Sequence, residues 1–142
     1  MFEVAMIQLA VNDYESRAQR FKTVEKYLTE IASANRRPQL IVLPEIWPTG
    51  FSNYDQYYQE SELIEGETFS MLAPWAERLD CYILGGSIVE RDGSDYYNTS
   101  LLINPNGSLS GFYRKIHLFG YQSEESRLLK PGCDLFVLKT RY

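Results

Sequence analysis

Glu45 and Lys115 are the two charged residues whose settings in the sequence best suit catalysis. Glu45 follows the apolar segment 39–43 and Pro44, and an aromatic loop rich in turn-forming residues, 46–51, comes next. Lys115 follows another segment with the composition of a strand. A carboxylate and an ammonium in one pocket suit acyl transfer, because the carboxylate takes a proton from a nucleophile and the ammonium stabilises the oxyanion of a tetrahedral intermediate. Taken singly, each has an ordinary alternative, a carboxylate that caps a turn and a solvated lysine.

The first forty-three residues predict the elements that place this carboxylate. Residues 2–11 have the composition of a strand, and Asn12 or Asp13 is a suitable cap for the helix that follows. Apolar residues recur at three- and four-residue steps over 14–37, which predicts an amphipathic helix. The apolar run 39–43 then predicts a buried strand. Strand, helix and strand in this order favour a parallel βαβ unit, in which ligands bind beyond the carboxyl ends of the strands.

The rest of the chain predicts a second helix and a group of short strands. The helix covers about 68–79 and contains Pro74, which favours a late start or a kink. Tight turns separate the next three strands, so we expect antiparallel neighbours. The expected strands are 81–90, 96–103 and 109–114, with a further buried strand beginning at 134–138. Loops are expected at 52–65 and 115–132, and a loop as long as the second is usually functional.

Length and composition exclude several classes of protein. A chain of 142 residues with formal net charge −5 fits one modest domain and disfavours nucleic acid, since phosphate contacts need a basic face. No apolar stretch is long enough to cross a bilayer and no signal peptide is recognisable, so we expect no membrane partner. Two cysteines favour a reducing compartment, here the cytoplasm. One histidine and two distant cysteines form no zinc motif, and no phosphate loop occurs.

Five short stretches resemble the nitrilase superfamily of carbon–nitrogen hydrolases, and the amidase branch with its ω-amidase-like enzymes in particular. They are residues 4–9, Leu-Pro-Glu at 43–45, Asn-Thr-Ser at 98–100, 113–119 around Lys115, and Glu124. The resemblance covers essentially the whole chain. It implies an α/β fold that forms the N-terminal portion of an α-β-β-α sandwich, four-layered when complete. It also implies hydrolysis of a small linear amide through a cysteine thioester, without metal or organic cofactor, in a protein that forms a homo-oligomer when complete.

The resemblance assigns roles to three residues and leaves one role unfilled. Glu45 is implied as the general base, Lys115 as the lysine that stabilises the intermediate, and Glu124 as a second glutamate that supports the site. Glu125, its neighbour, is an alternative for that third position. The family's nucleophilic cysteine follows the strand that begins near residue 134, a position that neither cysteine of this chain matches.

Residues 1–142 are therefore expected to form a single incomplete carbon–nitrogen hydrolase domain that is inactive alone. From the residues alone, Cys133 stays an alternative nucleophile. A function of another class also stays open: a non-catalytic binding or assembly module derived from the same fold, whose uncovered apolar sheet face would require a partner.

Overall fold

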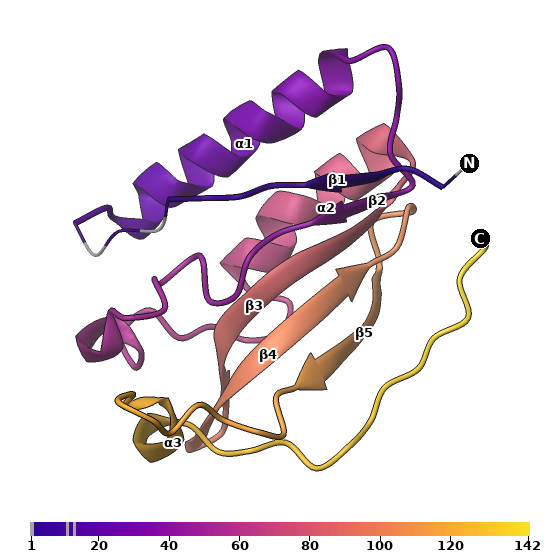
Figure 1. The fold of residues 1–142 in the computed structure, drawn as a ribbon. Helices are drawn as coiled ribbons and strands as arrows, with labels where there is room; N and C mark the ends of the chain where they lie inside the picture. Colours follow the sequence, from indigo (N-terminus) through magenta and orange to yellow (C-terminus); the bar gives the residue numbers. More distant parts are fainter. Residues whose placement is uncertain (1, 11, 13) are drawn as a thin grey trace.

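A mixed five-stranded sheet forms the centre of the protein (Figure 1). The computed structural model describes residues 2–10, 12 and 14–142. The strands lie in chain order: β1 (Val4–Met6), β2 (Leu40–Val42), β3 (Tyr82–Asp92), β4 (Asp95–Ile103) and β5 (Leu109–Arg114). The pairs β1–β2 and β2–β3 are parallel, whereas β3–β4 and β4–β5 are antiparallel. Both expected arrangements, the parallel unit and the antiparallel group, are confirmed.

The first helix, α1 (Arg17–Ser33), is shorter at both ends than the periodicity predicted. Ser16 is its N-cap and forms a capping box with Gln19, which satisfies the first free N–H groups of the helix. Asn12, the predicted cap, instead accepts backbone hydrogen bonds in the turn before the helix. The other predicted cap, Asp13, lies outside the described residues, as does the last residue of the predicted strand 2–11, of which only Val4–Met6 forms a strand.

The second helix, α2 (Glu67–Leu79), starts before Pro74 and continues through it, so the predicted late start is wrong. It ends at Leu79, and the next residue, Asp80, has a left-handed backbone, which lets the N–H group of Cys81 bond the carbonyl of Ala76 at 3.2 Å. Two short helical turns interrupt the loops. They are the 3-10 turn η1 (Tyr54–Gln56) and α3 (Glu125–Leu128). No helix among the described residues is long and apolar enough to cross a membrane.

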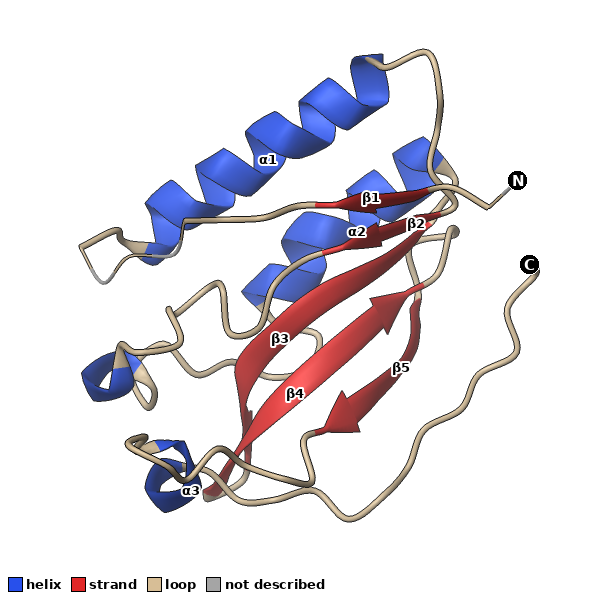
Figure 2. Cartoon of the chain, in the orientation of Figure 1, coloured by secondary structure: helices blue, strands red, loops and turns tan. Residues whose placement is uncertain are grey.

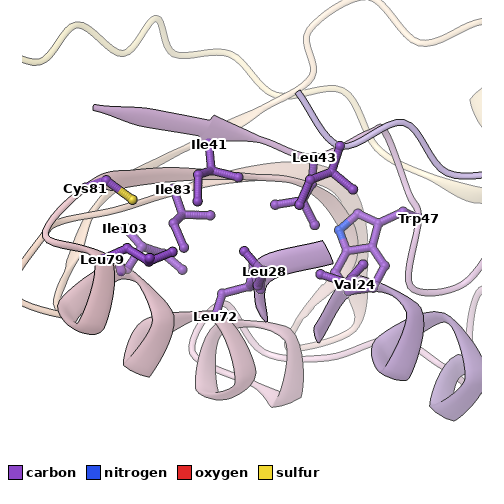
Figure 3. Close-up of a cluster of buried hydrophobic side chains, with 12 residues drawn as sticks. Val24, Leu28, Ile41, Leu43, Trp47, Leu72, Leu79, Cys81, Ile83 and Ile103 are labelled. Atoms are coloured by element: carbon purple, nitrogen blue, oxygen red, sulfur yellow. The ribbon is translucent and has the colours of Figure 1, made fainter. Parts of the chain in front are cut away.

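Both long helices pack against the same face of the sheet (Figures 2 and 3). Alternate strand residues point toward them, as a period of two requires. Ile41, Ile83 and Ile103 from three neighbouring strands meet Leu28 of α1 and Leu72 of α2, and all five are fully buried. This apolar layer fixes the strands whose carboxyl ends carry the candidate site.

The C-terminal segment corrects one sequence prediction. The strand expected from 134–138 does not form, and the chain from residue 130 onward runs beside β5 as an extended segment (Figure 2). Leu135 and Val137 are 83% and 93% exposed. The ring of Phe136 does pack closely over Gly111 of β5. A strand requires a neighbour that pairs with its backbone groups; in the described chain such bonds are made at Lys130 and Gly132, and residues 134–138 pair with no strand.

Candidate active site

Glu45 lies in a tight turn that β3 holds against the end of β2. The next residue, Ile46, has a φ of 43°, a left-handed conformation that is rare for a β-branched side chain. Its N–H group donates to the hydroxyl of Ser87 at 3.0 Å, and the Ser87 N–H group donates to the carbonyl of Pro44 at 3.3 Å. Ile46 is also fully buried. Packing and hydrogen bonds therefore maintain an unfavourable backbone conformation beside the carboxylate, as is common at functional sites.

Gly86 of β3 makes this turn possible. Its φ is +68°, and a Cβ atom at this position would lie 2.0 Å from the carbonyl oxygen of Pro44. Only glycine allows so close an approach. Beyond the turn, the indole N–H of the buried Trp47 donates to the carbonyl of Gly85 at 2.9 Å, which ties the loop to the same strand.

Lys115 reaches this turn from the end of β5. Its backbone N–H donates to the carbonyl of Asn98 on β4 at 2.8 Å. Its Nζ lies 2.7 Å from Oε1 of Glu45 and 3.0 Å from Oε2 of Glu125. The structure thus brings together the two side chains that the sequence paired, although seventy positions separate them; their roles in catalysis stay predictions.

The second carboxylate at this site belongs to Glu125 and not to Glu124. Glu124 is about half exposed and forms an ion pair with Arg127, 2.6 Å away. Glu125 is fully buried, and Oε2 accepts the backbone N–H of Phe119 at 2.6 Å as well as Lys115 Nζ. The placement of Glu124 at the site is therefore replaced by the neighbouring residue, the alternative that the sequence had left open. The two residues lie at the start of a helical turn, where successive side chains point about 100° apart.

Asn98 is a member of the site that the sequence did not single out as one. It lies on β4 and is 3% exposed. Its Nδ2 donates to Oε1 of Glu45 and to Oε1 of Glu125, in each case at 2.7 Å. The Asn-Thr-Ser stretch at 98–100 is part of the family resemblance, but it assigned no role to Asn98, because the contacts of this side chain follow from the register of β3, β4 and β5.

The electrostatics of the site favour a protonated lysine. Burial lowers the pKa of the Lys115 ammonium, but its hydrogen bonds and charge attraction to Glu45 and Glu125 outweigh burial, so the pKa is raised above its ordinary value. The ring of Phe51 lies 5.8 Å from Nζ and adds a cation–π contact. Burial, with smaller contributions from Tyr54 and the two glutamates, also raises the pKa of Tyr57 far above its usual range, so its hydroxyl stays neutral and donates to the Phe51 carbonyl at 2.7 Å.

A cavity of about 260 Å³ opens beside these groups. Its lining residues include Glu45, Asn98 and Lys115, together with apolar side chains from β3 and the end of β2. Neither cysteine lines it. Cys81 is buried, and this burial raises its pKa to about 11. The thiol of Cys133 is exposed and donates to Asp134, which raises its pKa. Nucleophilic thiols need a lowered pKa, so neither cysteine has the setting of a nucleophile.

Comparison with known proteins assigns the chain to a family. The carbon–nitrogen hydrolase family model matches residues 3–142. The chain belongs to the carbon–nitrogen hydrolase family. It is 31% identical to the 2-oxoglutaramate amidase of Paenarthrobacter nicotinovorans, with 96% of this chain and 47% of that protein aligned. It is 33% identical to the omega-amidase NIT2 of Danio rerio, with 99% of this chain and 51% of that protein aligned.

Solved carbon–nitrogen hydrolase structures confirm the fold. Saccharomyces cerevisiae Nit3, a member of branch 10 of the nitrilase superfamily, superposes with a TM-score of 0.79 at 28% identity, covering 99% of this chain and 52% of Nit3. A carbon–nitrogen hydrolase from Helicobacter pylori G27 has the same fold, with a TM-score of 0.80. The chain spans about half the length of these relatives. The mixed sheet and its two long helices therefore correspond to about half of the nitrilase fold.

Proposed function

We propose that this chain provides the acid–base half of an amidase site that hydrolyses the carbon–nitrogen bond of a small linear amide. One observation carries the proposal: Lys115 lies between the carboxylates of Glu45 and Glu125 at a cavity of about 260 Å³. Membership of the carbon–nitrogen hydrolase family supports the reaction class. The similarity to a 2-oxoglutaramate amidase and to an omega-amidase supports an amide substrate.

Glu45 is the general base in this proposal. Its Oε1 accepts from Lys115 and Asn98, and among the described residues its Oε2 has no hydrogen-bond donor. That oxygen takes the proton of a cysteine thiol as the sulfur attacks the amide carbonyl. The Lys115 ammonium stabilises the negative oxygen of the tetrahedral intermediate. Glu125 acts through Lys115, because its buried carboxylate holds the ammonium in place.

The reaction balances with water as the second substrate. Collapse of the intermediate breaks the carbon–nitrogen bond, and Glu45 returns the proton to the departing ammonia or amine, leaving a thioester. Glu45 then takes a proton from water as the water attacks the thioester. The carbon–sulfur bond breaks, the carboxylic acid leaves, and the thiol regains its proton. No step requires a redox partner.

The thiol in this scheme comes from outside residues 1–142. The settings of the two cysteines support this point, since neither lines the cavity and both have a raised pKa. We therefore propose that residues 1–142 are a single incomplete domain, inactive alone. Cytoplasmic location, self-association of the complete protein, and the lack of nucleic acid or membrane partners stay predictions from the sequence.

Ammonia release from a panel of ω-amides tests the proposal. We expect release by the gene product if the coding sequence beyond residue 142 adds a strand that ends in a cysteine, and no release by the 142-residue chain. Glu124→Gln is the matched control for Glu125→Gln, because the two residues are adjacent and only one contacts Lys115. Steady release by the 142-residue chain that survives Cys133→Ala would contradict the proposed source of the thiol.

One observation favours the non-catalytic alternative. Apolar side chains are exposed at both ends of the chain, with Met6 on the edge strand 81% exposed and Val137 93% exposed. Such surface is suited to a partner. A stop codon directly after Tyr142 would favour this alternative, and a cooperatively folding monomer of uniform size would then count against any required partner.

A further inference from the structure

We infer that Asn98 is a positioning residue that holds both carboxylates and the lysine of the site in one arrangement. This inference rests on the proposed function for its catalytic meaning, but its geometry stands independently. Asn98 is 3% exposed, so water competes little for its hydrogen bonds. It lies on β4, between β3, which supports the turn of Glu45, and β5, which Lys115 directly follows.

The side chain of Asn98 divides its two hydrogens between two carboxylates. Oε1 of Glu45 and Oε1 of Glu125 each lie 2.7 Å from Nδ2. An amide nitrogen carries two donors, and ionised carboxylate oxygens only accept, so the atom that faces them is the nitrogen and each hydrogen has one partner. A single side chain therefore donates to both glutamates, with no donor left over at that nitrogen.

The backbone of Asn98 fixes the third charged group. Its carbonyl accepts the N–H of Lys115 at 2.8 Å, directly beyond the last β4–β5 pair, Thr99 and Arg114. The Lys115 ammonium donates hydrogen bonds to the same two carboxylates. Asn98 thus contacts all three charged residues, and the four residues form a closed ring of hydrogen bonds.

The member of this ring that lies between the two carboxylates has to be a neutral donor. The two Oε1 atoms share one nitrogen partner, so they lie no farther apart than twice their distance to it, and like charges at that range repel. Lys115 supplies one positive charge against two negative ones. The Asn98 amide offsets part of the repulsion without adding a second positive charge, and it occupies Oε1 of Glu45 so that the other oxygen stays available to a proton.

Titration of the Lys115 ammonium by heteronuclear NMR tests the inference on the 142-residue chain. This experiment needs no measurement of enzymatic activity. Asn98→Ala removes both side-chain bonds. Asn98→Asp keeps the shape but replaces the donor with a third carboxyl group. Thr99→Val is the matched control: Thr99 is the next residue on β4, fully buried, and its hydroxyl bonds Glu90 instead of the site. Urea unfolding of each variant reports the general loss of stability.

We expect the raised pKa of Lys115 to fall toward its ordinary value in Asn98→Ala, because the carboxylates separate from the ammonium, and to stay raised in Thr99→Val. Asn98→Asp is expected to lose stability relative to the parent chain as the pH rises above about 4, where the introduced carboxyl ionises in the unfolded state. If Asn98→Ala does not fold, the pH dependence of the stability of Asn98→Asp still tests the inference. An unchanged Lys115 titration in a folded Asn98→Ala, or an Asn98→Asp whose loss of stability is the same at every pH, would overturn the inference.

In the active gene product, Asn98→Ala is expected to lower kcat/KM by about 10- to 100-fold and to displace the acidic limb of its pH profile, whereas Thr99→Val leaves that limb in place. Absence of ammonia release by the parent protein would count against the proposed function and leave the Lys115 titration as an independent result. A parent-like pH profile in an active Asn98→Ala enzyme would overturn the positioning role.

Discussion

Lys115 Nζ lies 3.0 Å from Oε2 of Glu125, and this carboxylate is fully buried. The pair joins the end of β5 to the first residue of α3, across a loop that the sequence marked as long and functional. A buried carboxylate is costly unless it is paired and hydrogen-bonded. Here Lys115, Asn98 and the N–H of Phe119 all donate to it. The loop is thus anchored to the sheet through the site itself.

This anchoring predicts that replacing two adjacent glutamates will lower the free energy of unfolding by unequal amounts. Glu125→Gln is expected to lower the free energy of unfolding by about 2 kcal/mol, because the ammonium loses a charged partner inside the protein. Glu124→Gln is expected to change it by less than about 0.5 kcal/mol, since its pair with Arg127 is exposed. Urea denaturation of the two variants checks this, and equal losses would contradict the assignment of Glu125.

The turn that carries Glu45 predicts a large loss of stability when Gly86 is replaced. Gly86→Ala is expected to cost about 3 kcal/mol or more, because the added Cβ meets the Pro44 carbonyl in addition to the strain of a positive φ. Gly93→Ala is the matched control, since Gly93 has a similar φ of +61° and nothing within 4 Å of the added atom. We expect about 1 kcal/mol there. Thermal unfolding measures both losses, and a Gly86→Ala loss no larger than that of Gly93→Ala would show that the close approach is unimportant.

The raised pKa of Lys115 predicts a pH dependence of stability at alkaline pH. A group whose pKa is higher in the folded state stabilises fully below its unfolded pKa, about 10.4 for lysine. That contribution is lost as the pH rises through the higher folded-state pKa. We therefore expect the stability difference between the parent chain and Lys115→Met to be constant near neutral pH and to shrink above about pH 10. Lys26→Met, at an exposed lysine, is the control. A difference that grows with pH would contradict the pairing.

The sequence predicted the sheet and the long helices well, because both depend on local periodicity. The spacing of apolar residues identified α1, and the tight turns identified the antiparallel strands β3, β4 and β5. The strand expected at 134–138 failed for a non-local reason: composition alone does not supply a hydrogen-bonded neighbour. Similarly, the helix end at Ser33 is set by capping and packing rather than by the periodic pattern.

The site was predictable only in part, for the same reason. The sequence paired Glu45 with Lys115 through their positions after strands and the family resemblance. It left Glu124 and Glu125 as alternatives, since one residue of register at the start of a helical turn decides which side chain points inward. Asn98 carried no signal of its own role, because the contacts of a strand amide depend on which strands are neighbours.

Ammonia release from ω-amides by the gene product that contains this chain, with and without Glu45→Gln, tests the central claim most directly. The proposed base predicts steady release by the parent protein and a fall of about 10²- to 10⁴-fold in kcat for Glu45→Gln, with the fold intact. Release that is undiminished in a correctly folded Glu45→Gln protein would contradict the assignment of Glu45 as the general base.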